Sequence, residues 1–231
     1  MKKVISYCLW GTENRYIKGM LRNIQLARDI YPGWTIYIYL GKDADIWLRD
    51  LLRKTAADHG VSLEIRSCNI ADWRLMLERF RAIIEVEVDV MISRDADSRL
   101  TLREKVAVDE WLASDKQWHV MHEHPFHAVP MLGGMWGVKK MPSLGNFKAA
   151  LNNWKAEDRL QTDQEFLAQQ VWPNIQGIVM NHDDGFFTHI WPGRPFPTKR
   201  QGCEFVGATV NADETMVSEQ LNVLKKVLRI H

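Results

Sequence analysis

The sequence contains few cysteines and no long apolar run. Its three cysteines, Cys8, Cys68 and Cys203, lie far apart and form no C-x-x-C motif. An odd, scattered set fits a reducing compartment, so we expect a cytoplasmic protein without a disulfide framework or a zinc site. The first residues, Met1–Cys8, are too few and too polar for a secretory signal, and no later run could cross a bilayer. We therefore expect no transmembrane segment.

A strong charge of either sign is missing as well. The formal net charge of the 231 residues is +1, which gives no global field that would favour nucleic acid or a membrane surface. We therefore expect no nucleic-acid partner. Hydrophobic residues make up 46% of the chain, enough for a substantial core. With no repeat, low-complexity tract or linker, the length predicts one domain over residues 1–231.

Glycine-rich phosphate-binding motifs are absent too. The first expected strand is followed by Trp10-Gly11-Thr12-Glu13-Asn14, which contains neither G-x-G-x-x-G nor a Walker A lysine. Dinucleotide-binding and P-loop functions are therefore weakly supported.

What is present is an alternation of strands and helices in the first hundred residues. Apolar residues at helical spacing predict three helices, and short β-branched or aromatic runs predict four strands. The expected order is strand 4–9, helix 16–31, strand 35–40, a helix from 47 to about 60, strand 61–65, a helix around 77–84, and strand 88–92. This order is typical of a doubly wound, mostly parallel sheet in a Rossmann-like α/β fold.

The second half follows a looser pattern. Thr101 and Glu104 form a capping box at the start of an expected helix. The expected elements are helix 102–114, strand 118–121, helices 147–154 and 164–171, an ordered loop region 181–207, and a closing amphipathic helix around 217–228.

Two carboxylates follow the fourth expected strand. Asp95 and Asp97 come directly after an apolar run, and Arg94 and Arg99 flank them. In open α/β sheets, ligands bind beyond the carboxyl ends of the strands. Paired carboxylate oxygens there suit a hard divalent cation, which typically shares its ligands with substrate phosphates. The pattern predicts a metal and phosphate site.

Several mechanisms use an Asp-x-Asp sequence. An EF-hand loop is excluded because Arg99 and Leu100 stand where it needs an oxygen ligand and a glycine. A haloacid-dehalogenase-like phosphatase would use Asp95 as its nucleophile, and remains an alternative. A glycosyltransferase of the GT-A class would hold Mn²⁺ or Mg²⁺ against a nucleotide-sugar diphosphate. A surface turn with two acids is the simplest non-functional explanation.

Three glycines lie within five residues in Gly133-Gly134-Met135-Trp136-Gly137. They permit close approach of the backbone to a ligand, or they form a bulged strand. Both interpretations stay open.

Several further motifs give the chain a resemblance to a known family. It resembles a small group of bacterial and viral GT-A glycosyltransferases that includes glycosyltransferase domains of chloroviruses. The motifs that carry it run from residue 6 to about 207: Ser6-Tyr7-Cys8-Leu9-Trp10-Gly11, Tyr31-Pro32-Gly33-Trp34, Arg79-Phe80, Arg94-Asp95-Ala96-Asp97-Ser98-Arg99-Leu100, Arg103-Glu104, Val108-Asp109-Glu110-Trp111, Gly133-Gly134-Met135-Trp136-Gly137, Thr162-Asp163-Gln164 and Phe196-Pro197-Thr198-Lys199-Arg200. Glu78 departs from the group, whose members often have Trp before the Arg-Phe pair.

The resemblance implies a nucleotide-binding half, residues 1–100, and an acceptor half, residues 101–231. It also implies roles for single residues. The nucleoside would lie against Ser6, Tyr7, Cys8 and Leu9. The metal would be held by Asp95, Asp97 and His182, with Asp97 the more direct ligand, and the diphosphate by Lys199 and Arg200. Arg79 and Arg99 would support the sugar or the carboxylates, Gly133 and Gly134 would border the sugar and the acceptor, and Ala96 would contact the donor.

Each of these roles has a simpler alternative. His182 is one of eight histidines, and His122, His124 and His127 are rivals as metal ligands. Lys199-Arg200 could be a solvated pair, and Arg103-Glu104 an ordinary pair on a helix face. Asp163 would face the reacting sugar or cap the helix that follows it.

The resemblance implies transfer of a sugar from a nucleotide diphosphate, with UDP favoured and GDP possible, to a hydroxyl of a glycan or other acceptor. If the anomeric configuration inverts, a carboxylate must take the acceptor proton. Asp163 is the first candidate for this base, followed by Glu123 and Asp184. A catalytically inactive GT-A domain that binds a nucleotide or a partner is the non-enzymatic alternative.

Overall fold

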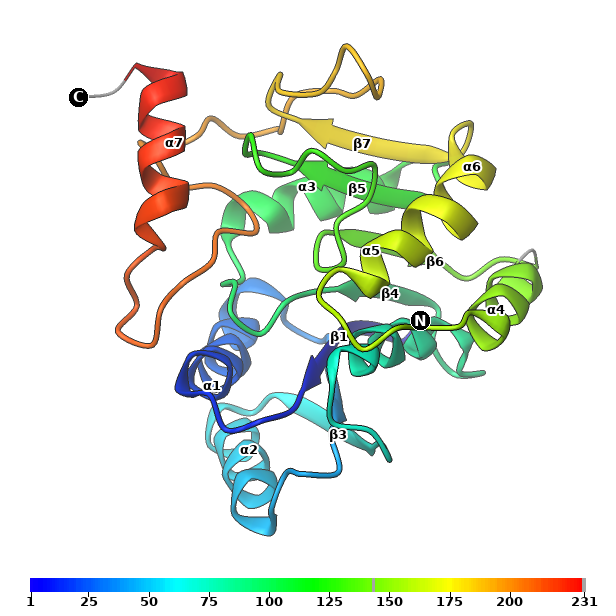
Figure 1. Ribbon diagram of the computed structural model, residues 1–231, viewed down its shortest axis with the longest axis vertical. Helices are drawn as coiled ribbons and strands as arrows, with labels where there is room; N and C mark the ends of the chain where they lie inside the picture. The colour runs from blue at the N-terminus through cyan, green and yellow to red at the C-terminus, as the bar shows by residue number, and fades with distance from the viewer. Residues whose placement is uncertain (143, 230–231) are drawn as a thin grey trace.

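The structure is a computed structural model that describes residues 1–142 and 144–229. Its first half alternates strands and helices in the order predicted (Figure 1). The elements are β1 (Lys3–Leu9), α1 (Asn14–Ile30), β2 (Thr35–Leu40), α2 (Ile46–His59), β3 (Ser62–Ser67), η1 (Trp73–Ile84) and β4 (Val90–Ser93).

The second half contains shorter elements. They are α3 (Leu102–Ala113), β5 (Trp118–His122), β6 (Trp136–Lys139), α4 (Leu144–Asn153), α5 (Thr162–Phe166), η2 (Leu167–Val171), α6 (Trp172–Ile175), β7 (Val179–Asp183) and α7 (Ser218–Leu228). None of the helices in residues 1–142 and 144–229 is long and apolar enough to cross a membrane.

Local signals in the sequence explain several helix ends. The Asp45 side chain accepts a hydrogen bond from the backbone N–H of Leu48 and starts α2, and Gly60, at φ 66°, ends it. Thr101 caps α3 through the N–H of Glu104 as predicted. The Glu104 carboxylate, however, accepts from Arg94 Nε at 3.0 Å and from the Tyr31 hydroxyl at 3.0 Å. Glu104 is therefore part of a buried polar cluster and not of a solvated pair with Arg103.

One seven-stranded sheet, in the order β3-β2-β1-β4-β6-β5-β7, forms the centre of the molecule. The pairs within β3-β2-β1-β4 are parallel, β6 is antiparallel to both neighbours, and β5 pairs with β7 in parallel. The prediction of a mostly parallel sheet flanked by helices is confirmed.

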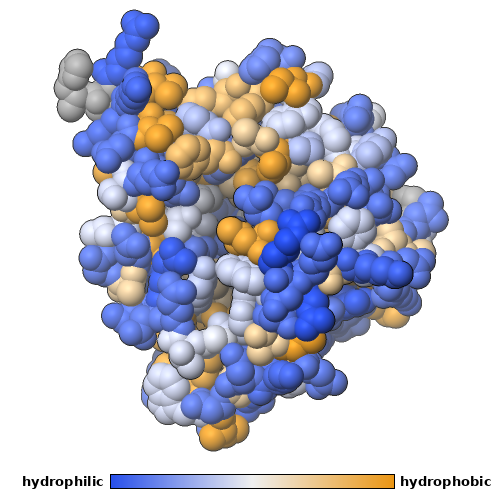
Figure 2. Space-filling view, in the orientation of Figure 1, coloured by the Kyte–Doolittle hydropathy of each residue, from blue (hydrophilic) through white to orange (hydrophobic). Residues whose placement is uncertain are grey.

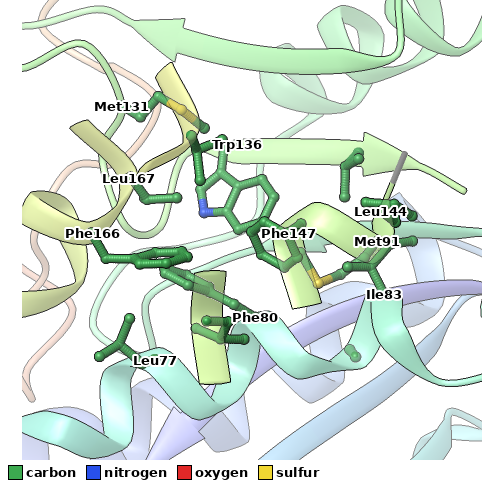
Figure 3. Packing of buried hydrophobic residues seen from close by; sticks show 14 of the residues in the cluster. Leu77, Phe80, Ile83, Met91, Met131, Trp136, Leu144, Phe147, Phe166 and Leu167 are labelled. Atoms are coloured by element: carbon green, nitrogen blue, oxygen red, sulfur yellow. The ribbon is translucent and has the colours of Figure 1, made fainter. Parts of the chain in front are cut away.

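Two apolar layers enclose the sheet because successive strand residues point to opposite faces. In β1, Ile5 and Tyr7 pack against α1, α2 and α3, whereas Val4 and Cys8 face the layer of η1, α4 and α5. In that second layer Phe80, Trp136, Phe147 and Phe166 point toward one another (Figure 3). The Phe80 and Trp136 ring centroids are 5.0 Å apart, edge to face. This packing fixes η1 and α5 against the sheet.

Three predicted elements differ from the structure. The third helix, η1, is a 3₁₀ helix of 12 residues, and the predicted helix 164–171 starts at Thr162 and continues through a π-helical turn. Residues 181–183, predicted as loop, belong to β7. The loop prediction was wrong there because Pro and Gly are frequent only after this point, and a five-residue strand gives little periodic signal.

Candidate functional site

The two aspartates lie where the direction of the strand connections reverses. From β1 the chain continues outward to β2 and β3, and it then returns to β4 on the other side of β1. The carboxyl ends of β1 and β4 therefore lie side by side, and the Arg94 N–H donates to the Ser6 carbonyl at 3.0 Å. Such a switch point leaves a crevice for ligands. Asp95 and Asp97 follow β4 at this crevice.

A cavity of about 520 Å³ opens there, a volume typical of a small-molecule site. This face of the molecule is hollowed near its centre (Figure 2). Eight of the residues predicted from the sequence line this cavity: Cys8, Leu9, Arg79, Asp95, Ala96, Asp97, Gly133 and Asp163.

Arg79 joins the carboxylates of the two halves of the chain. Its guanidinium donates to Asp95 Oδ1 at 2.5 Å, to Asp163 Oδ2 at 2.7 Å and to the Arg94 carbonyl at 2.9 Å. Burial opposes the charge of Arg79, but the neighbouring carboxylates, above all Asp95, raise its pKa above the usual value. Arg79 thus stays charged and orients both acids.

Gly133 and Gly134 precede β6, so they form no bulge within the strand. A Cβ atom at Gly133 would overlap the Asp163 carboxylate, and one at Gly134 would overlap the Asp95 carboxylate. The structure therefore favours the close-approach interpretation of these glycines, in which bare backbone lets both acids reach the site.

Asp163 is fully buried in the first turn of α5. Its Oδ1 accepts from the N–H of Gln164 at 2.9 Å, and its Oδ2 accepts from Arg79. Burial raises the pKa of Asp163, while the Arg79 charge opposes this rise. The helix begins before Asp163, so this side chain does not take the expected N-cap position.

The charge of Asp97 is incompletely balanced by the protein. Burial, followed by the nearby Asp95 carboxylate, raises the pKa of Asp97 to about 6, while Arg15 Nε lies 3.7 Å away. A buried carboxylate with a raised pKa beside a second carboxylate fits a divalent cation, which would offset the negative charge of the pair. Residues 1–142 and 144–229 contain no group of three or more His, Cys, Asp or Glu side chains placed to hold a metal. A cation here would take its other ligands from phosphate and water.

His182 does not lie with the two aspartates. It lies on β7, where its Nδ1 is 2.8 Å from His119 Nε2 and its Nε2 is 3.2 Å from Glu110 Oε2. Both ring nitrogens are thus engaged in a buried network, and burial lowers the pKa of His182. His182 therefore does not line the cavity with Asp95 and Asp97, where we expected it.

Glu123 and Asp184 form an ion cluster with Arg103 and Arg200 outside the cavity. Arg103 Nε donates to Glu123 Oε1 at 2.7 Å, and Arg200 donates to Asp184 Oδ2 at 2.8 Å. The N–H of Val206 donates to Glu123 Oε2 at 2.7 Å. These residues do not line the cavity, where we expected the catalytic acids and the phosphate contact of Arg200, and their contacts anchor the C-terminal segment.

Other expected donor contacts are also absent from the cavity. Ser6 is buried, and its hydroxyl donates to the Arg79 carbonyl at 2.6 Å, a hydrogen bond that ties η1 to β1. Tyr7 faces the layer of α1 and α3, Arg99 pairs with Glu214 at 2.8 Å, and Lys199 is exposed in a different cavity.

The cavity also contains residues that the sequence interpretation did not assign. Trp10 and Trp73 pack edge to face, with ring centroids 5.5 Å apart, beside Tyr16 and Leu160. Thr209, from the segment before α7, closes another side. Trp10 could have been found, since it follows the end of β1 directly, whereas Trp73, Leu160 and Thr209 come from parts of the chain with no local signal.

No protein-family model and no curated protein matches the chain. Solved structures do match its fold. A glycosyltransferase involved in glycosylation of the major capsid of PBCV-1 is 16% identical, with 80% of this chain and 82% of that chain covered and a TM-score of 0.50. A Pyrobaculum calidifontis mannosyltransferase in complex with GDP-Man and Mn²⁺ is 14% identical, with coverage of 79% and 55% and a TM-score of 0.54.

A Bacillus anthracis protein assigned as a glucose-1-phosphate thymidylyltransferase is 12% identical, with 100% of this chain and 96% of that chain covered and a TM-score of 0.56. Sequence identities this low establish the fold alone. The chain has the α/β fold of GT-A glycosyltransferases, as the resemblance implied. It spans only about half, 55%, of the mannosyltransferase.

Proposed function

We propose that the protein is a metal-dependent glycosyltransferase. It would transfer a sugar from a nucleotide diphosphate, a UDP-sugar in preference to a GDP-sugar, to a hydroxyl of a glycan or other acceptor. The observation that carries the proposal is the position of Asp95 and Asp97 at the switch point of the sheet, facing a 520 Å³ cavity with Arg79 and Asp163. A fold neighbour that holds GDP-Man and Mn²⁺ supports the same class of donor and metal.

In this proposal Asp97 is the direct ligand of Mn²⁺ or Mg²⁺, and Asp95 assists while Arg79 fixes its orientation. The bound cation would stabilise the negative charge that gathers on the departing nucleotide diphosphate. Cys8 and Leu9 at the end of β1 would border the nucleoside, with the Trp10 and Trp73 rings beside them. The backbone of Gly133 would lie along the sugar.

Asp163 is the candidate base if the reaction inverts the anomeric centre. Of the three candidate acids it is the one that lines the cavity. Burial raises its pKa, against the opposing charge of Arg79, and a raised pKa makes a carboxylate a better proton acceptor. An NMR measurement of the product's anomeric configuration tests this role, because a retaining reaction needs no such base.

The scattered free cysteines Cys8, Cys68 and Cys203 support a reducing compartment, which we propose is the cytoplasm.

Calorimetric titration with UDP and GDP, with and without Mn²⁺, tests the proposal. We expect metal-dependent binding of one nucleotide, and we expect the same titration of Asp97→Asn to show none. Failure of both nucleotides to bind would reject the proposal. Binding without any turnover of UDP- or GDP-sugars would instead support the inactive GT-A domain.

Two other enzymatic functions give distinct results. A phosphatase would form an acyl-phosphate on Asp95 without a nucleotide, but the fold does not favour it, and Asp95 is held by Arg79. The second alternative is nucleotidyl transfer, which the fold neighbour assigned as a thymidylyltransferase supports. In that reaction dTTP or UTP would react with glucose 1-phosphate and release pyrophosphate. The loop after β1 has one glycine, Gly11, and not the glycine-rich backbone suited to a triphosphate.

A further inference from the structure

The 520 Å³ cavity has little positive charge for a diphosphate. In the part of the chain that the structure describes, Arg79 is the only basic residue lining it, and two carboxylates and a carbonyl already engage its guanidinium. Lys199 and Arg200, to which the resemblance assigned the diphosphate, lie outside it. Another cation is close by: Arg15, in the first turn of α1, forms the one ion pair of Asp97 among the described residues, with its Nε 3.7 Å from Oδ2.

The guanidinium of Arg15 makes few of the hydrogen bonds that it could make. Its Nη2 donates to the Tyr16 hydroxyl at 2.8 Å, and its central carbon lies 4.8 Å from the centroid of the Tyr16 ring. Its Nε is buried and has no hydrogen-bond partner within residues 1–142 and 144–229, since Glu13, at 3.4 Å, and Asp97 are held near it by charge alone. Because a guanidinium carries five N–H groups in a fork that suits phosphate oxygens, Arg15 keeps donors for a ligand.

Helix stability does not explain a cation at this position. The first turn of α1 contains no acidic residue, and the Glu13 side chain at its N-cap accepts no hydrogen bond from the helix. The positive end of the helix macrodipole repels a cation there. A positive charge that its own helix disfavours indicates a role toward a negatively charged partner.

Tyr16 connects this charge to the cavity. It lines the cavity together with Asp97, and its hydroxyl oxygen accepts from Arg15. An arginine N–H can only donate, so the hydroxyl keeps its own proton, and this proton has no acceptor among the residues that the structure describes. The pair therefore offers a hydroxyl donor with a guanidinium behind it to a ligand in the cavity.

Two donors and a permanent positive charge suit an anion with several oxygens. A divalent cation held by Asp97 would take over the carboxylate charge that Arg15 now balances, and it would share its remaining ligands with phosphate. Arg15 would then exchange one anionic neighbour for another. A sugar hydroxyl carries no charge, so it would leave the guanidinium without a counter-ion.

We propose that Arg15 and Tyr16 bind the diphosphate of the donor beside Asp97. Arg15 pairs with Asp97 while no cation is bound, and it donates to a phosphate oxygen when the cation is present. The nucleotide sugar as ligand rests on the proposed transferase function. Inorganic pyrophosphate is therefore the first probe, because it tests the diphosphate site without a nucleoside or a sugar.

Calorimetric titration with pyrophosphate and with UDP, each with Mg²⁺, tests the site. We expect Arg15→Met to bind both ligands at least tenfold more weakly than the unchanged protein, and Tyr16→Phe, which lacks one hydroxyl, to bind them severalfold more weakly. Arg28→Met is the matched control, because it removes the same charge from the last turn of α1, where the side chain is 58% exposed. We expect this control to bind within twofold of the unchanged protein.

Binding of Mn²⁺ alone, followed by electron paramagnetic resonance, separates this role from a structural one. Removal of a neighbouring positive charge favours a cation, so we expect Arg15→Met to bind Mn²⁺ at least as tightly as the unchanged protein. A distorted site would instead lose the ion and pyrophosphate together. Weaker binding of Mn²⁺ by Arg15→Met would therefore overturn the proposal.

The two ligands also distinguish this proposal from the transferase function. Pyrophosphate that does not bind, or that binds equally to the unchanged protein and both variants, would overturn the diphosphate site. An effect on UDP without one on pyrophosphate would place the two residues at the nucleoside and overturn it as well. Pyrophosphate binding that depends on Arg15, without turnover of any nucleotide sugar, would support the site and reject the transferase.

Discussion

At the scale of single residues, Arg79 is the buried charge on which the site depends. Removing one partner of a buried ion pair costs about 3–5 kcal/mol, because the other charge is left uncompensated. We expect Arg79→Met to lower the free energy of unfolding by about this amount, since Asp163 is fully buried beside it. Chemical denaturation measures the change.

The double variant Arg79→Met/Asp163→Asn separates the ion pair from packing. We expect it to regain part of the lost stability, because no buried carboxylate is left without its cation. A double variant that is less stable than the single one would show that the methionine fits poorly and that charge is not the cause.

Asp97 provides the corresponding test of the chemistry. A metal that stabilises the departing diphosphate contributes several kcal/mol, and about 1.4 kcal/mol corresponds to a tenfold change in rate. We therefore expect Asp97→Asn to lower turnover of the nucleotide sugar at least about a hundredfold. Asp109→Asn is the control, since that carboxylate is 53% exposed and pairs with Lys105 on α3. Near-normal turnover of Asp97→Asn would remove the metal role of Asp97.

Single residues also show how far a sequence can predict a site. Asp95 and Asp97 were recognisable because a strand pattern places their carboxylates at the ligand-binding edge. The positions of His182 and Glu123 could not be recognised in the same way, because their hydrogen-bond partners, such as His119 and Arg103, lie on different elements. Trp73 was missed because most tryptophans belong to the core, and its place at the cavity depends on the packing of η1.

At the scale of elements, α1 supports the loop that carries the two aspartates. The Asn23 side chain donates to the Ser98 carbonyl at 2.8 Å and accepts from the Leu100 N–H at 3.0 Å. A Cβ atom at Gly19 would overlap the Ala96 carbonyl. The helix backbone itself thus contacts the loop between Asp95 and Asp97.

Gly19→Ala tests this contact. Alanine alone would favour the helix by about 1 kcal/mol, but overpacking typically costs about 1–3 kcal/mol. We expect a net loss of stability and weaker metal-dependent nucleotide binding by calorimetry, because the loop must move. Gly145→Ala in α4 is the control: its Cβ would meet nothing within 4 Å, so we expect it to be neutral or slightly stabilising. Equal effects of both changes would contradict the contact.

The elements themselves were largely predictable, because β-α alternation gives long periodic segments. Short elements were less so. The antiparallel direction of β6 could not be derived from its four residues, and β7 lay hidden at the start of a proline-rich stretch. In both cases pairing with distant strands, and not local pattern, decides the structure.

At the scale of the whole molecule, buried histidines make stability depend on pH. Burial lowers the pKa of each member of this set: His119, His122, His124, His127 and His182. Below the ordinary histidine value of about 6.5 the unfolded chain binds more protons than the folded one, so stability falls as pH falls. The raised pKa values of Asp97, Glu123 and Asp163 act in the opposite direction but are fewer.

We therefore expect the melting temperature to be nearly constant above about pH 7 and to decrease as the pH falls through 6.5 to 6.0, at constant ionic strength. Each fully exchanged proton contributes about 1.4 kcal/mol per pH unit. A melting temperature that does not decrease as the pH falls from 7 to 6 would contradict a lowered pKa of these histidines in the folded protein.

The place of β6 between β4 and β5 has a consequence for synthesis on the ribosome. β4 is fully buried, yet the strand that covers its outer edge, Trp136–Lys139, emerges more than forty residues later. Until then a nascent chain carries an apolar strand edge of the kind that promotes aggregation. Gly133 and Asp163 follow Asp97 by 36 and 66 residues, so the cavity that they line with the two aspartates forms only after this later segment has been synthesised.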